Sequence, residues 1–298
     1  MPPRLVDYAL ADWLRLRPVV QGFKTARYRA ADRRFRGMPA RSGDVAALAA
    51  LMQGQRVLIA IAFNDPQTIA WQARLIRRYV ADTLYVVADN TAGDDAAGEI
   101  ERAAAAAGAP YVRLPRNLWS GASRSHGLAL NWVWQNLVLP GQPRAFGFID
   151  DDIYPTAPDD PFAALAGQDF YGVVRLGVPR SADDRVSRWF LWAGFCIYRF
   201  AAVRDVALDF SQDWFLGLDT GGGNWEVLYR HVERSRLREQ SSVFVPCREG
   251  MAIEDAPLQW CGSWLHAVGL MGRPAFAADK ARAIAEILEP HLAQAGPT

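Results

Sequence analysis

Cysteine, net charge and long apolar runs are all scarce in this chain of 298 residues. Its three cysteines, Cys196, Cys247 and Cys261, are widely spaced and form no C-x-x-C pattern, which argues against a structural zinc site or a disulfide framework. The N-terminus lacks the continuous apolar stretch of a signal peptide, and no segment is long and charge-free enough to span a bilayer. We therefore expect a soluble protein of the reducing cytoplasm.

The formal net charge is only +1, which gives no overall attraction to nucleic acid, so we expect no nucleic-acid partner. The charge is nevertheless uneven, because residues 1–44 hold ten Lys or Arg against four Asp. We treat residues 1–50 as a basic N-terminal extension. A solvated or self-packed arm is the commoner outcome for such a segment, and peripheral contact with a membrane stays open.

Half of the residues are hydrophobic, and apolar strands alternate with helical patterns through the first half of the chain. The pattern predicts strands at 57–63, 83–88, 110–114 and 145–149, and helices at 67–80, 94–107 and 121–138. This alternation is typical of an α/β fold with a mostly parallel, Rossmann-like central sheet flanked by helices. Ligands of such a sheet bind at the carboxyl ends of its strands.

The second half is rich in aromatic residues and follows no βα repeat. We expect strands at 170–175, 188–199 and 243–245, a helix opened by Gly221–Gly223 that runs to Glu239, and a closing helix at 277–294. Backbone N–H groups of the glycine run can approach an anion closely. No linker divides the chain, so residues 51–298 are expected to form one domain.

Three consecutive carboxylates, Asp150, Asp151 and Asp152, end the apolar strand at 145–149. Repulsion and desolvation both oppose such a cluster unless a cation is bound. Side chains alternate along an extended segment, so Asp150 and Asp152 point to one side as an Asp-x-Asp pair suited to Mn²⁺ or Mg²⁺. The alternative is a turn whose Asp side chains cap backbone amides.

Polar residues also follow the other predicted strands. Asn64 follows the first, Asp89-Asn90-Thr91 follows the second, and Arg116-Asn117 precedes Gly121-Ala122-Ser123-Arg124 after the third. Together with the Asp triplet, this order over residues 56–155 resembles a GT-A fold glycosyltransferase of the family 2 type. The resemblance implies a GT-A-like sheet, with residues 56–155 as the nucleotide-binding half and 156–298 as the acceptor half.

The resemblance also implies roles for individual residues. Asn64 and Asp89 would hold the base and ribose, Asn117 and Arg124 would shape the donor pocket, Asp150 and Asp152 would bind the metal, and Asp151 would hold the loop or the donor sugar. His266 lies where some GT-A enzymes supply a third metal ligand. Asp219 would be the general base, with Glu226, Glu254 and Asp255 as competitors.

The implied function is a metal-dependent, inverting, hexosyltransferase-type transfer from a nucleotide-diphosphate sugar to an acceptor hydroxyl. A UDP-sugar is the expected donor, and a glycan, a lipid-linked molecule or a small molecule is the expected acceptor. Two alternatives remain. One is a nucleotidyltransferase, and the other is a non-catalytic relative that binds a sugar or a partner protein through the same site.

Overall fold

The computed structural model describes residues 13, 17–119, 121–177, 188–269 and 271–293. Arg4 and Arg15 of the basic extension lie outside this range, as does residue 294 of the predicted closing helix. No helix among the described residues is long and apolar enough to cross a membrane.

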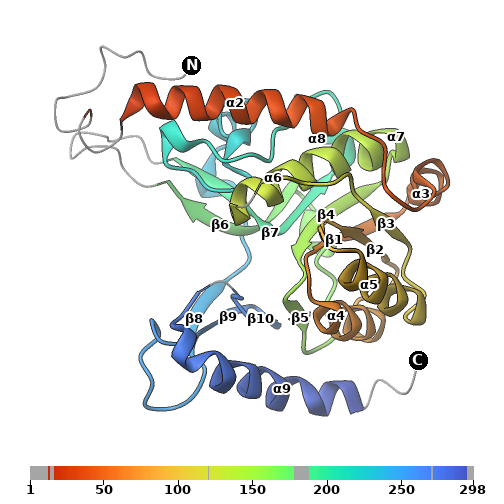
Figure 1. Ribbon diagram of the computed structural model, residues 1–298, viewed down its shortest axis with the longest axis vertical. Coiled ribbons are helices and arrows are strands. Elements are labelled where there is room, and N and C mark those ends of the chain that lie inside the picture. The colour runs from red at the N-terminus through yellow and green to blue at the C-terminus, as the bar shows by residue number, and fades with distance from the viewer. Residues whose placement is uncertain (1–12, 14–16, 120, 178–187, 270, 294–298) are drawn as a thin grey trace.

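A six-stranded sheet forms the centre of the molecule, in the order β3-β2-β1-β4-β7-β6 (Figure 1). Its strands are β1 (Arg56–Ala62), β2 (Leu84–Asp89), β3 (Tyr111–Arg113), β4 (Ala145–Asp150), β6 (Phe170–Leu176) and β7 (Trp189–Arg199). The first four are parallel, and β7 pairs antiparallel with both β4 and β6. The predicted mostly parallel α/β sheet is therefore confirmed.

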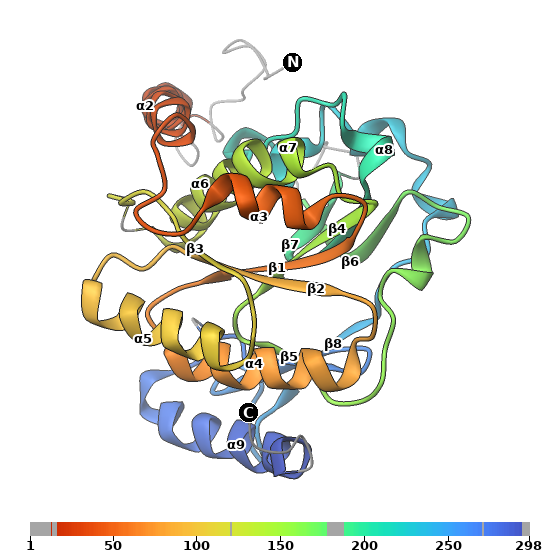
Figure 2. The same cartoon turned by 90° about the vertical axis from the view of Figure 1, so that its right-hand side faces the viewer.

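Helices cover both faces of this sheet (Figure 2). One face carries α4 (Pro66–Tyr79) and α5 (Asp94–Ala106), and the other carries α3 (Val45–Met52), α6 (Ala122–Val133), a π-helical turn (Trp134–Val138) and α7 (Leu139–Gly141). The strands are buried on both sides because their residues face a separate apolar cluster on each. The predicted helix at 121–138 is thus an α-helix followed by a π-helical turn.

A second, four-stranded antiparallel sheet was not predicted. It has the order β5-β10-β9-β8, with strands β5 (Ile153–Pro155), β8 (Ser242–Pro246), β9 (Pro257–Cys261) and β10 (Trp264–His266). Helix α9 (Ala277–Ala293) packs near it, with Ile284 and Leu288 in a shared apolar cluster (Figure 1). Because β5 directly follows the Asp triplet, this sheet is tied to the end of β4.

The described part of the N-terminal extension contains a long helix, α2 (Pro18–Arg36), which packs against α6. Tyr28, Asp32 and Phe35 are buried in this contact. Further along, Ser42 bridges to Arg113 at the edge of the central sheet. The described part of the extension therefore packs on the rest of the protein at Tyr28, Asp32, Phe35 and Ser42. This agrees with the expectation of a solvated or self-packed arm.

The predicted helix from Gly221 to Glu239 is wrong. This stretch holds only three short 3-10 turns, Gly222–Asn224, Tyr229–His231 and Arg234–Arg236. The backbone N–H of Gly221 donates to Phe210 O at 2.8 Å, and that of Gly223 donates to Ser211 O at 2.8 Å. These amides are consequently used inside the protein and do not offer the expected anion site. The remaining short elements are α8 (Phe200–Val203) and the 3-10 turns Ala163–Leu165, Trp214–Leu216 and Pro274–Phe276.

Candidate metal and donor site

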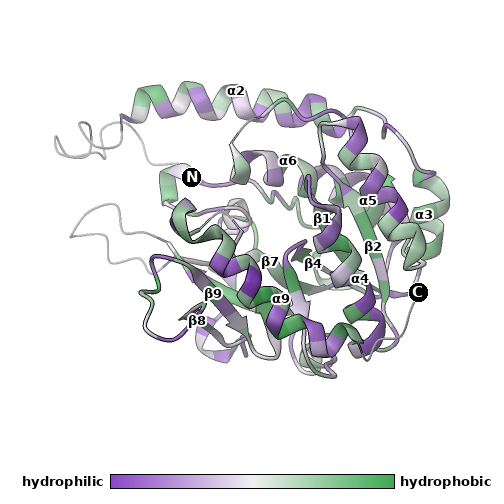
Figure 3. Ribbon diagram, turned by 60° about the horizontal axis from the view of Figure 1, so that its bottom comes forward, coloured by the Kyte–Doolittle hydropathy of each residue, from purple (hydrophilic) through white to green (hydrophobic). Residues whose placement is uncertain are grey.

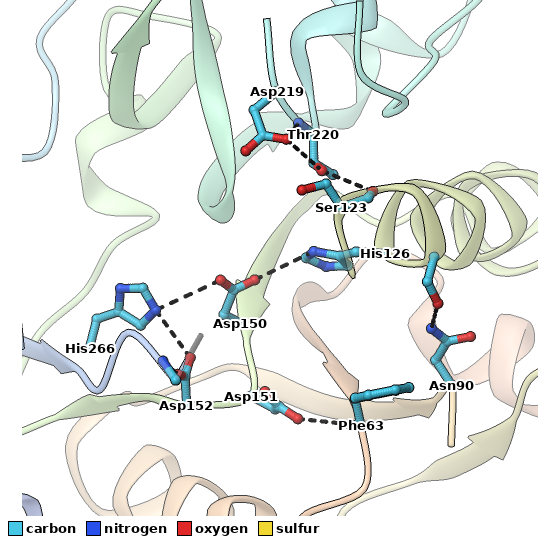
Figure 4. Close-up of polar contacts among 12 residues, drawn as sticks. Phe63, Asn90, Ser123, His126, Asp150, Asp151, Asp152, Asp219, Thr220 and His266 are labelled. Atoms are coloured by element: carbon cyan, nitrogen blue, oxygen red, sulfur yellow. Dashed lines mark hydrogen bonds and ion pairs between the residues drawn. The ribbon is translucent and has the colours of Figure 1, made fainter. Parts of the chain in front are cut away.

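Two carboxylates and one imidazole meet where the two sheets join (Figure 4). Asp150 ends β4, Asp152 lies directly before β5, and His266 ends β10. In the antiparallel pairing of β10 with β5, His266 lies opposite Ile153. His266 Nε2 lies 3.1 Å from Asp152 Oδ1 and 3.9 Å from Asp150 Oδ2. One ligand atom from each residue lies within 4.8 Å of the others, so the three can share one cation.

The tautomer of His266 can be derived from its partners. Gln259 Oε1 lies 2.9 Å from His266 Nδ1 and accepts a hydrogen bond from the Arg175 guanidinium at 3.2 Å. The Gln259 amide nitrogen donates to Ser242 Oγ. An oxygen that already accepts from arginine must accept from His266 too, so Nδ1 carries a proton. In the neutral ring, Nε2 then presents its lone pair to Asp150 and Asp152, as a metal ligand requires.

The electrostatics of the cluster follow from burial and close contact. Burial raises the pKa of Asp150, with the charges of Asp152 and Asp219 adding to the effect and those of His126 and His266 opposing it. Burial also works against ionisation of Asp152, but attraction to His266 and hydrogen bonds from His266 and Gly269 N lower its pKa overall. Burial would lower the pKa of His266, and Asp152 outweighs it and raises that pKa. The protein alone therefore compensates the negative charge of Asp152 through His266, whereas burial opposes the negative charge of Asp150.

His126 approaches Asp150 from the opposite side. It projects from α6, and its Nδ1 atom lies 3.8 Å from Asp150 Oδ1 (Figure 4). Its Nε2 atom is buried without a hydrogen-bond partner. From the sequence, His126 was only a lone histidine near Arg124. Its place beside Asp150 could not be read there, because it depends on how α6 packs against β4.

Asp151 points away from the pair, as strand alternation predicts. Its Oδ2 accepts a hydrogen bond from Phe63 N at 2.8 Å and so holds the loop that follows β1. Asn64, next in that loop, has a positive φ of 61° and an exposed side chain, and its N–H donates to Thr91 Oγ1 at 2.8 Å. Asparagine tolerates this backbone conformation better than most residues.

The residues after β2 and β3 form an internal hydrogen-bond network. Asp89 is fully buried, and its two oxygens accept from Thr91 N at 2.8 Å and Tyr111 Oη at 2.7 Å. Asn117 donates to Asn90 Oδ1 at 3.1 Å and to Ser125 O at 3.0 Å. The expected direct contact of Asp89 with ribose is not favoured by this burial, because the carboxylate exposes no surface and both oxygens bind protein.

Arg124 is also placed differently from the expectation. Its guanidinium lies over the rings of Trp119 at 5.6 Å and Tyr28 at 5.9 Å, against helix α2. The described side chains therefore hold Arg124 in a cation–π stack against α2, whereas the expectation gave it a part in shaping the donor pocket. The arginine that does face the carboxylate cluster is Arg175 on β6, which stacks on Trp192 at 5.3 Å and bonds Gln259.

Asp219 lies close enough to Asp150 for its charge to raise the pKa of that carboxyl. Its Oδ1 accepts from Thr220 N at 2.8 Å and from Gln212 Nε2 at 2.9 Å, and Thr220 in turn donates to Ser123 O at 3.0 Å (Figure 4). The side chain is exposed but fixed in orientation. Of its competitors, Glu226 pairs with Arg230 and Asp255 pairs with Arg273, and Glu254 is exposed.

Two further residues shape the site without a signal in the sequence. Trp192 on β7 lies with its ring centroid 4.8 Å from that of His266. Gly194 leaves the space that Asp150 occupies, because a Cβ there would lie 2.5 Å from Asp150 Oδ2 and would overlap the Trp192 ring. A glycine within a buried aromatic strand suggests a close approach, but the sequence does not say to which group.

The donor set fits a divalent cation. Oxygen ligands suit Mg²⁺ and Mn²⁺, and the imidazole favours Mn²⁺ over Mg²⁺. A bound cation would also remove the repulsion between Asp150 and Asp152 and the cost of burying them. The alternative of a simple turn explains Asp151, whose carboxylate caps Phe63 N. It does not explain why Asp150, Asp152 and His266 converge.

No protein-family model matches the chain, and no curated protein matches it significantly. Among solved structures, it is similar to TarS of S. aureus, with 18% identity and a TM-score of 0.34, over 52% of this chain and 30% of that one. It is also similar to the mannosyltransferase PcManGT of Pyrobaculum calidifontis in complex with GDP-Man and Mn²⁺, with 15% identity and a TM-score of 0.34, over 67% and 60% of the two chains.

Both matches are GT-A-type glycosyltransferases, the class that the sequence resembles. This chain spans less than two thirds of either protein. Both likenesses are weak, with TM-scores below 0.5.

Proposed function

We propose that the protein is a divalent-metal-dependent glycosyltransferase that uses a nucleotide-diphosphate sugar. The observation that carries the proposal is the meeting of Asp150, Asp152 and His266 at the carboxyl end of a parallel strand, with the Nε2 atom of His266 directed at the carboxylates. Ligands of α/β sheets bind at this edge. A bound Mn²⁺ or Mg²⁺ supplies the positive charge that neutralises a leaving diphosphate.

The nucleotide would lie beyond the end of β1. Phe63 is 51% exposed beside Asn64, and its backbone is held by Asp151. An exposed aromatic ring fixed in this way can stack on a base, and the Asn64 side chain can hydrogen-bond base or ribose. Asp89, Asn90 and Asn117 support the adjoining loops through their internal hydrogen bonds.

Asp219 would deprotonate the acceptor hydroxyl. Its Oδ1 is fixed by Thr220 and Gln212, so the carboxylate has a set orientation on the side of Asp150 that faces away from Asp151 (Figure 4). A general base must lie within hydrogen-bond reach of the proton that it takes. An attack by the acceptor on the face opposite the leaving diphosphate would invert the anomeric carbon, and the aromatic second half of the chain would select the acceptor.

The test is metal and donor binding. We expect Mn²⁺ to bind the wild-type protein and to be required for binding of a nucleotide sugar in a screen of UDP-, GDP- and dTDP-sugars by thermal shift and calorimetry. Asp150→Asn and Asp152→Asn should weaken Mn²⁺ binding by more than about 100-fold, since loss of an outer-shell partner alone typically costs 10–100-fold. Asp205→Asn is the control, because that carboxylate is 87% exposed and pairs with neighbouring Arg204.

Two results would contradict the proposal. One is nucleotide-sugar binding with unchanged Mn²⁺ dependence in both site variants. The other is an absence of any donor binding or donor turnover by a folded wild-type protein that does bind Mn²⁺, which would favour the non-catalytic binding alternative. Turnover of a nucleoside triphosphate and a sugar phosphate, with release of pyrophosphate, would favour a nucleotidyltransferase.

A further inference from the structure

One face of helix α2 combines exposed apolar side chains with basic ones. Val19 and Val20 are 44% and 48% exposed, and Phe23 is 75% exposed. An α-helix turns about 100° per residue, so Val19 and Phe23 lie on the side opposite Tyr28 and Phe35, which are buried against the protein. Figures 1 and 3 show this end of α2 projecting past the rest of the molecule.

The loop between β3 and α6 contacts the same helix. Arg27, one turn after Phe23, lies over the Trp119 ring at 5.3 Å, and Trp119 packs edge-on against Tyr28 at 5.4 Å. Leu118, directly before Trp119, is 84% exposed, the most exposed of the large apolar residues described. The loop that carries the exposed Leu118 therefore contacts α2 at Arg27 and Tyr28.

The charge of this face is strongly positive. Helix α2 holds six basic residues and one acidic residue, and that acidic residue, Asp32, is buried and paired with Arg36 at 2.5 Å. Lys24, Arg27 and Arg34 are exposed on and beside the side that carries Phe23. The exposed surface of this helix therefore offers positive charge with no exposed carboxylate of its own.

We propose that this face, formed by Val19, Val20, Phe23, Lys24, Arg27, Arg34 and Leu118, docks on an anionic lipid bilayer. The apolar tips would enter the headgroup region, where aromatic and aliphatic side chains are stabilised. The basic residues would remain at the phosphate level, with their aliphatic stems along the boundary. Charge complementarity selects the anionic bilayer, because apolar tips alone would fit any apolar partner and the basic residues require a negative one.

This docking does not depend on the proposed transferase activity, because none of its residues belongs to the carboxylate cluster. It can therefore be tested without a donor. The assay is sedimentation of the full chain with phosphatidylcholine vesicles, alone or containing about one third phosphatidylglycerol, a fraction chosen to make the surface clearly negative. We expect binding to the mixed vesicles only, and weaker binding as salt increases.

Single variants separate the contribution of the apolar side chains to vesicle binding from that of the basic side chains. Phe23→Ser should lower the partition coefficient by about tenfold, since it removes one large apolar side chain from the interface. Lys24→Ala and Arg34→Ala should each lower it by about fivefold. Leu51→Ser and Arg102→Ala are matched controls on α3 and α5, where the side chains are exposed but lie outside the face, and they should bind as the wild type does.

Absence of binding to the mixed vesicles would overturn the proposal, as would equal binding by the wild type and Phe23→Ser. If the face is instead covered by a second copy of the chain, light scattering will show a dimer that Phe23→Ser dissociates, with no vesicle binding. Failure of donor binding with intact vesicle binding would count against the transferase function alone.

Discussion

The sharpest test of the site geometry is Gly194→Ala, because it adds one methyl group and changes no charge. Gly194 precedes Phe195, the β7 partner of Ile149, and so lies beside Asp150. An alanine Cβ would lie 2.5 Å from Asp150 Oδ2, whereas ordinary contact begins at 3.4 Å. The carboxylate oxygen would therefore have to retreat by about 0.9 Å, several times the 0.2 Å tolerance of a metal–ligand distance.

Two measurable effects follow from this displacement. Overpacking a well-filled site typically costs about 1–3 kcal/mol, so the melting temperature should fall by several degrees. Displacement of Asp150, together with Trp192 that stacks on His266, should weaken Mn²⁺ binding by about 10–100-fold, the range seen when ligand orientation is lost. Isothermal calorimetry with Mn²⁺ measures the second effect, and differential scanning calorimetry the first.

Gly147→Ala is the matched control. Gly147 lies in the same sheet, and a Cβ there would lie 2.9 Å from Cys196 O and overlap Ile197, but it meets no carboxylate. It should lower the melting temperature without weakening Mn²⁺ binding. If Gly194→Ala is folded and binds Mn²⁺ within about twofold of the wild type, a change below the 10–100-fold range, then Asp150 is not a ligand in this arrangement.

Four further substitutions address separate parts of the site. Gln259→Leu should weaken Mn²⁺ binding by about tenfold, because His266 Nδ1 loses the acceptor that fixes its tautomer; unchanged calorimetric affinity would contradict this. Phe63→Ala should raise the donor KM by roughly tenfold through lost base stacking while kcat is kept, and a fall in kcat alone would contradict it. Asp219→Asn should lower kcat by roughly 100-fold or more with Mn²⁺ affinity unchanged, and full activity would exclude it as the base. Burial raises the pKa of the Asp151 carboxyl well above 3.8. The folded protein therefore keeps this carboxyl protonated to a higher pH than the unfolded chain does. As a result, the free energy of unfolding falls as the pH rises above 3.8. Asp151→Asn keeps an acceptor for Phe63 N, so with chelator present its melting temperature should exceed that of the wild type at pH 7 and approach it near pH 4.

The first half of the fold could be predicted because its signals are local. Strands buried on both faces read as continuous apolar runs, and the helices between them have a periodic pattern. The alternation of side chains in a strand also separated Asp150 and Asp152 from Asp151 correctly, since Asp151 alone turns to the loop after β1. These features depend only on neighbours within a few residues.

The second sheet could not be predicted because its strands pair across long distances in the sequence. Strands β5 and β10 have three residues each, too few to show a period, and their pairing joins Ile153 to His266 across more than a hundred residues of sequence. The helix expected after Gly221 failed for a related reason. The glycine amides donate to Phe210 and Ser211, and Asn224 accepts from Asp209 N, so tertiary hydrogen bonds replace those of a helix.

The metal ligands and the proposed base differ in how firmly neighbouring residues define their state. Asp150 and His266 can be tied together by geometry, because β10 carries His266 to the end of β4 and Gln259 fixes its tautomer. Asp219 has no such partner that assigns a proton to it, and Thr220 and Gln212 would hold its carboxylate equally well as a turn cap. Asp219 could act as a base that takes the acceptor proton or as a cap that holds its loop. A loss of kcat in Asp219→Asn, measured with the donor and at unchanged Mn²⁺ affinity, distinguishes the base from the cap.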